Sequence, residues 1–265
     1  MSETRYIESC RFSSGDLRPS DRIEHYRNVV CRMLGTLDIE PVRESFACSG
    51  RFLRLPDLGV SRIASSAIRG TRTRQMAIGD EELVLIASLD GTATLSHLGR
   101  KATIPVGGAI LVSSMEPCRV EWGESCRMNV RVPRAVLAPM IADTDAAFMS
   151  VIPAAIEPLL LLTSYIDLLL RDSMLMERPA ELRRLAVCHV HDLLALTLGA
   201  TRDAAEITAG RGLRAARMST IKEDIAQNLA GDVTVAALSA RHRLSPRYIR
   251  KLFEVENTSL SRFVL

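Results

Sequence analysis

The sequence predicts an α+β chain, in which an N-terminal β-sandwich or barrel with flanking helices precedes a separate α-helical domain. Two observations predict this class. Short apolar stretches bounded by turn residues run from about 51 to 133, as in a small antiparallel sandwich or barrel. From about residue 154 the apolar residues recur every three or four positions, which is typical of amphipathic helices. With 265 residues, the chain is long enough for two domains that each bury a core.

The strand region reads ELVLIASL, TATLSHL, KATIPV and AILVSS in succession. Three glycine-containing pairs separate these segments: Asp90-Gly91, Gly99-Arg100 and Gly107-Gly108. The first pair predicts a two-residue hairpin, because glycine readily adopts the positive φ that such a turn demands.

The segment CRMNVRV has a period of two. Its apolar residues Met128, Val130 and Val132 alternate with the polar residues Asn129 and Arg131. Such alternation predicts a strand with one face on the core and the other face in water.

Two apolar segments, AIEPLLLLTSYIDLLLRD and ELRRLAVCHVHDLLALTLG, predict consecutive helices separated by a break at Arg178-Pro179. In the second helix one apolar stripe is expected, with Ala186 and Val190 beside it: Leu182, Leu185, His189, Leu193 and Leu196. Helices this apolar must be covered by the strands, by each other or by a second copy of the chain. Because much of the first helix is apolar on all sides, we expect a homodimer through this region.

The segment ATRDAAEITAGRGL lacks an apolar period and predicts an interdomain linker over 201–213. The chain therefore divides into a domain over 1–200, with its helical part at about 154–200, and a helical domain over 214–265. A helix with one apolar face opens the second domain and ends at Gly231, which suits a helix C-cap. That face comprises Met218, Ile221, Ile225 and Leu229.

The stretch RHRLSPRYIRKLF, residues 241–253, holds five Arg or Lys residues and no carboxylate. Thr234 is placed to cap a short helix before it, and Ser245 to cap a second helix whose first position is Pro246. Two short helices joined this tightly predict a helix-turn-helix, whose second helix is shaped to enter the DNA major groove.

The second helix has two opposed faces. At about 100° per residue, Ile249, Leu252 and Phe253 lie on one side, whereas the cations lie on the other. A charge run is usually only a solvated surface, but such surfaces mix both signs, and here no acid occurs before Glu254. Because the chain's net charge is only +3, attraction to an anionic partner must come from this local cluster.

The stretch GDVTVAALSARHRLSPRYIRKLFEVENTSLSRFVL resembles the first helix-turn-helix of AraC/XylS-type transcription regulators. The Ser-Pro-Arg-Tyr helix start, the Leu-Phe pair and the later Thr-Ser carry the resemblance. The strands followed by two apolar helices resemble, more weakly, the cupin-like effector-binding and dimerisation domain common in that family. The resemblance implies a cytoplasmic, sequence-specific DNA-binding regulator, controlled by a small-molecule effector in the N-terminal domain, with RNA polymerase as a further candidate partner.

Carried onto this chain, the resemblance makes Arg247, Arg250 and Lys251 the contacts to base edges and nearby phosphates. Ser245 would hold the helix start and contact the DNA backbone. For Arg241 and Arg243 two alternatives stay open, contact with DNA phosphates or exposure to water.

The sequence also departs from the family pattern. Asn257 stands where a glycine is usual, a mild change because asparagine tolerates positive φ. The chain ends after SRFVL, where family members continue into a second helix-turn-helix, so a partial, truncated DNA-binding domain is expected. This leaves an alternative, a truncated effector-binding and dimerisation module with little specific DNA binding. The effector, the target sequence, and whether the protein is an activator or a repressor stay open.

No catalytic residues, metal or cofactor are expected, and the chain is not predicted to be an enzyme. Nucleophile-elbow, phosphate-loop and dinucleotide motifs are absent from the sequence. His97 is the only histidine of the strand region, and His189 and His191 would point about 200° apart on a helix. Trp122 and His97 are candidates to line an effector pocket, although a buried tryptophan more often belongs to the core.

Cysteine usage and the N-terminus predict a cytoplasmic location. The six cysteines are scattered without metal-binding spacing, as expected for reduced thiols. The polar N-terminus lacks the apolar segment of a signal peptide. The longest apolar run, Leu159 to Leu170, is shorter than the about 20 residues that cross a bilayer, so no membrane partner is expected.

Overall fold

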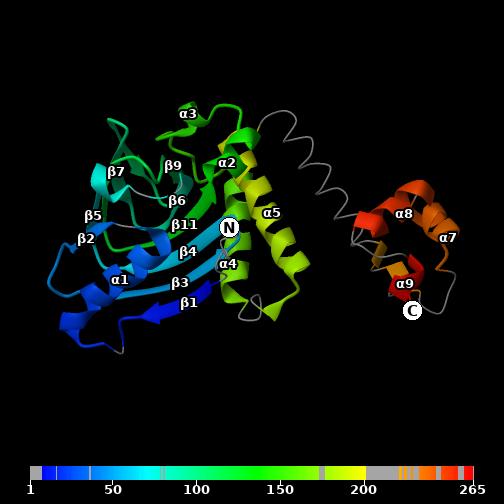
Figure 1. The fold of residues 1–265 in the computed structure, drawn as a ribbon, viewed down its shortest axis with the longest axis horizontal. Helices are drawn as coiled ribbons and strands as arrows, with labels where there is room; N and C mark the ends of the chain where they lie inside the picture. The colour runs from blue at the N-terminus through cyan, green and yellow to red at the C-terminus, as the bar shows by residue number, and fades with distance from the viewer. Residues whose placement is uncertain are drawn as a thin grey trace. The chain divides into compact units, whose positions relative to one another are not determined.

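The computed structural model describes most of the chain, in two compact units, Met1–Ala204 and Ala205–Leu265 (Figure 1). The described residues are 8–15, 17–35, 37–77, 79, 81–172, 177–200, 221–222, 224–225, 228, 233–242, 246–255 and 260–264. Among them, no helix is long and apolar enough to span a membrane.

The first unit is a sandwich of two antiparallel sheets, which confirms the predicted β-sandwich with flanking helices. The first sheet has six strands in the order β1 (Glu8–Ser13), β3 (Cys48–Leu55), β4 (Leu58–Ser65), β11 (Ser125–Pro133), β6 (Glu82–Asp90) and β9 (Ala109–Ser113). The second sheet has five strands in the order β2 (Asp38–Pro41), β5 (Ile68–Arg72), β10 (Cys118–Trp122), β7 (Ala93–His97) and β8 (Arg100–Ile104).

Helices flank the sandwich. They are α1 (Arg22–Leu34), the short α2 (Arg134–Leu137) and α3 (Thr144–Ala147), and the long α4 (Glu157–Arg171) and α5 (Ala180–Leu198). The helices α4 and α5 lie side by side against the outer face of the six-stranded sheet (Figure 1). One apolar core fills this interface, and a second fills the space between the sheets, where α1 contributes Tyr26 and Val30.

The face of α5 that meets the sheet differs from the predicted stripe. Ala186, Val190 and Leu194 are buried in the helix-side core, whereas Leu182 and Leu185 are exposed. The helix carries leucines on two sides, so its spacing alone could not show which side packs on the sheet.

The hairpin predicted at Asp90-Gly91 is wrong, because the chain changes sheet there. β6 belongs to the six-stranded sheet and β7 to the five-stranded sheet. Gly91 does adopt positive φ, 73°. The two-residue hairpin lies instead at Leu98-Gly99, whose φ values of 51° and 70° are those of a type I′ turn, between the paired strands β7 and β8.

The expectation of a wet face on β11 is also wrong. Met128, Val130 and Val132 pack in the helix-side core as predicted. The alternating residues Arg127, Asn129 and Arg131 are only 5%, 7% and 8% exposed, because their face of the strand turns into the sandwich. A strand at the centre of a covered sheet has no side in water.

The second unit is helical, with α7 (Val235–His242), α8 (Pro246–Val255) and α9 (Leu260–Val264). Its core combines residues from these helices and from 221–225: Ile221, Ile225, Leu238, Ile249, Leu252 and Phe253. Thr234 caps α7 as predicted, since its Oγ1 accepts a hydrogen bond of 3.2 Å from the Ala237 amide. Several predicted features lie outside the described residues: the linker 201–213, Met218, Leu229, Gly231, Arg243 and Ser245.

Candidate functional site

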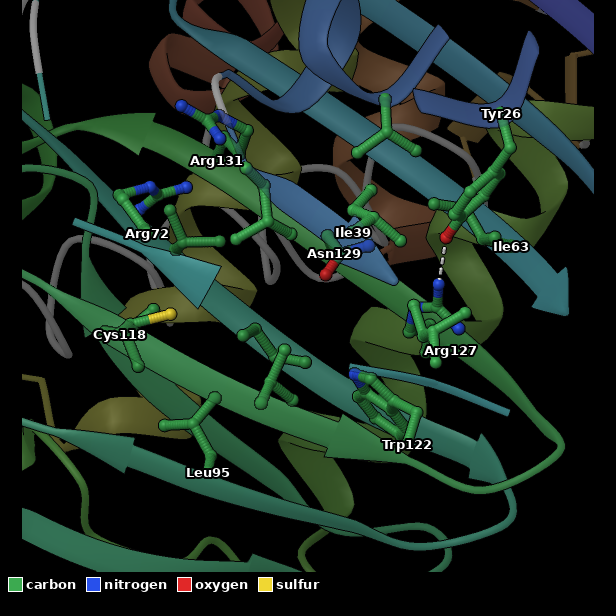
Figure 2. A pocket seen from close by; sticks show the side chains of 17 residues that line it. Tyr26, Ile39, Ile63, Arg72, Leu95, Cys118, Trp122, Arg127, Asn129 and Arg131 are labelled. Carbon is green, nitrogen blue, oxygen red and sulfur yellow. Dashed lines mark hydrogen bonds between the residues drawn. The ribbon is translucent and has the colours of Figure 1, made fainter. Parts of the chain in front are cut away.

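A cavity of about 80 Å³ lies between the two sheets, and mostly apolar side chains line it. Polar side chains occupy its two ends (Figure 2). Arg72 and Arg131 lie at one end, Arg127 lies with Tyr26 and Trp122 at the other, and Asn129 lies between them. Ile39, Ile63 and Leu95 are among its apolar lining residues.

The polar row comes from one strand. Arg127, Asn129 and Arg131 are two residues apart on β11, so the period of two in a strand places all three on the cavity side. The neighbouring strand β4 offers small hydroxyl side chains to this row. Asn129 Nδ2 donates to Ser61 Oγ at 3.0 Å, and Arg127 Nη1 donates to Ser65 Oγ at 3.0 Å.

The described hydrogen-bond partners of Arg127 are all neutral. Besides Ser65, its guanidinium donates to Ser125 Oγ at 3.3 Å and, through Nη2, to Tyr26 Oη. Its Cζ lies 5.3 Å from the centroid of the Trp122 ring, within reach of a cation–π contact. Within the described part of the chain, no carboxylate forms an ion pair with Arg127.

Burial raises the pKa of Tyr26, and Arg127 only partly opposes this rise. The pKa of the nearby Cys48 thiol is raised by burial as well. Both groups therefore stay protonated near neutral pH, and neither supplies a negative charge to Arg127.

At the other end of the cavity, Arg131 pairs with a carboxylate. Arg131 Nε donates to Glu82 Oε2 at 2.7 Å, and burial lowers the Arg131 pKa while Glu82 raises it. Arg72 Nη1 donates to the Ser114 carbonyl at 3.2 Å. Glu82 thus supplies a counter-charge here, unlike at the Arg127 end.

Of the two residues predicted to line an effector pocket, the structure places one in the cavity. Trp122 lines the cavity and is buried. His97 does not line it and instead belongs to an open hollow on the surface that shares Arg72 and Cys118 with the cavity.

Arg127, Asn129 and Arg131 were not predicted as pocket residues. A signal for them exists in the sequence, since the two apolar helices that follow β11 need a sheet face to cover. If Met128, Val130 and Val132 provide that face, the alternating polar residues must point into the sandwich.

The predicted DNA-contacting residues belong to α8. Ile249, Leu252 and Phe253 are buried on one side of this helix as predicted, and Arg250 is exposed. The backbone of Arg247 and Lys251 is helical, but their side chains lie outside the described residues, as does the whole of Ser245.

Arg241 has a partner within its own unit. Its Nε donates to Asp224 Oδ2 at 2.8 Å, and His242 Nε2 lies 2.7 Å from the same oxygen. The hydrogen bond from Arg241 is the main cause that lowers the Asp224 pKa. This contact ties α7 to the segment around residue 224.

The two histidines of α5 have separate partners. His189 Nδ1 lies 3.3 Å from Tyr165 Oη, whereas His191 Nε2 donates to the Asp57 carbonyl at 2.9 Å. Among the described residues, no group of three His, Cys, Asp or Glu side chains is placed to hold a metal ion.

The chain thus has a β-sandwich unit that encloses a cavity, followed by a separate helical unit. Comparison with known proteins identifies the family. The chain belongs to the AraC-binding-like domain family, whose model matches residues 26–199. It is 26% identical over 242 residues to the transcriptional activator RhrA of Rhizobium meliloti (strain 1021), a match that covers 90% of this chain and 74% of RhrA.

The fold is also similar to a solved structure. The AraC-like transcriptional activator CuxR superposes with a TM-score of 0.57, covering 97% of this chain and 92% of CuxR, at 19% identity. Both relatives are described as transcriptional activators and not as enzymes.

Proposed function

We propose that this protein is a sequence-specific DNA-binding transcription regulator of the AraC type and that its cavity holds a small-molecule effector. One observation carries the DNA-binding part. The helix α8 buries Ile249, Leu252 and Phe253 against Leu238 of α7, which leaves Arg250 exposed on the opposite side. A second helix packed in this way on a first is the arrangement of a helix-turn-helix.

Helical spacing assigns the reading face. Arg247, Arg250 and Lys251 share the side opposite the buried residues, and we assign them to base edges and nearby phosphates. An arginine fork can bond O6 and N7 of guanine together, which discriminates by roughly 1–3 kcal/mol against a wrong base. Ser245, immediately before α8, is assigned to the helix start and the DNA backbone.

The family supports the effector part. The matched region, residues 26–199, contains the whole cavity described above. We therefore assign residues 1–200 to effector binding and dimerisation, 201–213 to the linker, and 214–265 to DNA binding.

Exposed leucines on the two long helices support a homodimer. Large exposed apolar patches mark interaction sites. Three leucines on α4 are more than half exposed. The exposed members on α4 and α5 are Leu160, Leu161, Leu168, Leu182 and Leu185. A dimer would present two copies of α8, matching the two half-sites that helix-turn-helix proteins commonly bind. RNA polymerase is a further partner we propose, because the curated relative is an activator.

A gel-shift titration at two salt concentrations tests the DNA-binding assignment. We expect the triple variant Arg247→Ala, Arg250→Ala, Lys251→Ala to lose specific retention of promoter DNA. Removing three phosphate-neutralising cations lowers the salt slope of log K by up to about 2.7.

A matched triple variant controls for net charge. Arg18, Arg43 and Arg184 are exposed in the first unit, and replacing them with alanine changes the charge equally. This control should bind like the wild type. Equal, weak and unselective binding by all three proteins would instead favour an effector-binding and dimerisation module with little specific DNA binding.

A further inference from the structure

We propose that the ligand of the cavity is a small organic monocarboxylate, which pairs with Arg127 while its apolar body lies against Trp122, Ile63 and Leu95. The inference rests on the proposed function only in taking this cavity as the effector site. It adds the chemical class of the ligand.

Arg127 carries a buried positive charge. A guanidinium does not lose its proton in a protein, and a buried cation without a counter-ion is destabilising. Arg127 is 5% exposed, and its described partners are the hydroxyls of Ser65, Ser125 and Tyr26. Because Tyr26 and Cys48 stay protonated, no described partner of Arg127 balances its charge, and a bound anion would do so.

The free donors of Arg127 fit a carboxylate. The two serines take the hydrogens of Nη1, and Tyr26 takes one hydrogen of Nη2. This leaves Nε–H and the second Nη2–H without a bond to the described residues. Arginine binds a carboxylate through two such parallel N–H groups.

The count of charges selects a monoanion. The second buried guanidinium, Arg131, already pairs with Glu82 through its own Nε and Nη2. Of the two buried guanidiniums in the cavity, Arg127 is therefore the one with no carboxylate partner among the described residues. A phosphate dianion would need a further cation at that end.

The walls determine the rest of the ligand. Ile63 lies directly across from Arg127 in the pairing of β4 with β11, and Trp122 packs beside the guanidinium. At roughly 10–15 Å³ per water-sized position, the cavity of about 80 Å³ holds about five to eight such positions. These dimensions suit an acid of about four to six carbons, with Asn129 as one further polar contact.

The surface beside the cavity is cationic. An open hollow on the surface shares Arg72 and Cys118 with the cavity. Its other charged lining residues are one acid, Glu116, and four cations: Arg74, Arg100, Lys101 and Arg119. Clustered positive charge of this kind raises the local concentration of anions.

Trp122 gives a direct readout, because it is the only tryptophan of the chain. The full chain is titrated with butanoate and with hexanoate, with the corresponding amides as neutral isosteres, and with inorganic phosphate at equal ionic strength. Tryptophan emission and the thermal midpoint are recorded. We expect a saturable change with at least one carboxylate, and none with its amide or with phosphate at the same concentration.

Variants of Arg127 test whether this side chain binds the carboxylate. Arg127→Met should weaken carboxylate binding at least tenfold, and Arg127→Lys, which keeps the charge but not the fork, should weaken it severalfold. Arg43→Met, at an exposed arginine that lines neither the cavity nor the hollow, should bind like the wild type. Circular dichroism establishes that each variant is folded, and Arg127→Lys decides the question if Arg127→Met does not fold.

Three results would overturn the proposal: no response to either carboxylate, an equal response to the amide, or an unchanged response in the folded Arg127 variant. The gel shift separates this failure from failure of the proposed function. A chain that selects DNA but ignores carboxylates is still a regulator, with a ligand of another class. A chain that binds carboxylates but selects no DNA retains the ligand site and loses the proposed function.

Discussion

The hydrogen bonds of His97 fix its protonation. The Ser113 amide donates to His97 Nε2 at 3.1 Å, so the ring proton lies on Nδ1 and is donated to the Pro117 carbonyl at 3.0 Å. A second ring proton would face the Ser113 N–H and break that bond. Burial lowers the pKa of His97, with smaller opposing contributions from Pro117 and Glu116.

This arrangement predicts a loss of stability in mild acid. The unfolded chain binds a proton at His97 near its ordinary pKa of 6.5, whereas the folded chain binds it only at lower pH. The stabilisation is complete above about pH 6.5 and is lost as the pH falls through the folded pKa. His191, whose pKa is also lowered by burial, contributes in the same direction.

Melting curves at pH 7.5 and pH 5 check this prediction. Because breaking one buried hydrogen bond costs on the order of 1 kcal/mol, the drop in thermal midpoint should be about 2–4 °C smaller in His97→Gln than in the wild type. Equal drops in the two proteins would show that His97 does not titrate in this range.

Two glycines with similar φ should differ in their tolerance of alanine. At Gly91 (φ 73°) an added Cβ would lie 2.4 Å from the Glu124 carbonyl oxygen, whereas at Gly99 (φ 70°) nothing lies within 4 Å. Gly99→Ala should destabilise by about 1–2 kcal/mol through positive φ alone. Gly91→Ala should lose at least about 1 kcal/mol more, since backbone must move.

Urea unfolding of both variants measures the difference. Equal losses would mean that the Glu124 carbonyl moves away freely.

At the scale of secondary-structure elements, α4 has two apolar faces with different roles. Leu159, Leu162, Ile166 and Leu169 are buried in the helix-side core. Leu161 and Leu168 are 60% and 62% exposed on the other side. An ordinary surface helix would carry polar residues there, so we propose that a partner protomer covers this second face.

Substitutions on the two faces of α4 should have different effects, one on stability and the other on dimerisation. Leu162→Ala opens a cavity in the core and should destabilise by about 2–5 kcal/mol. Leu168→Glu should leave the circular dichroism spectrum unchanged and shift the protein from dimer to monomer in sedimentation velocity. A wild-type protein that sediments as a monomer, or a Leu168→Glu dimer, would contradict the assignment of this face.

The elements differ in how far the sequence could predict them. The faces of α8 were predictable because its apolar and basic residues separate completely around the helix. The faces of α5 were not, because leucines occur on two sides. The turn at Gly91 was recognisable by residue type, yet its connection was not, since strand pairing between β6, β9 and β11 is set by residues far apart in the chain.

At the scale of the whole molecule, the sequence predicted the order of a strand-rich part followed by helices, because the change of apolar period is local. The cavity could not be predicted, because its walls come from two sheets and from α1. Whether Arg127 faces water or the interior depends on which side of β11 the helices cover, and this is a property of the assembled sandwich.

We propose that the face of α8 that carries Arg250 reads DNA sequence. The most direct test selects duplexes from a random-sequence pool with the full chain and with Arg250→Ala, and sequences what is bound. We expect the wild type to enrich one motif and Arg250→Ala to enrich the same motif with one position relaxed, by about 1–3 kcal/mol of discrimination. A wild-type chain that enriches no motif, or an Arg250→Ala profile identical to that of the wild type, would contradict it.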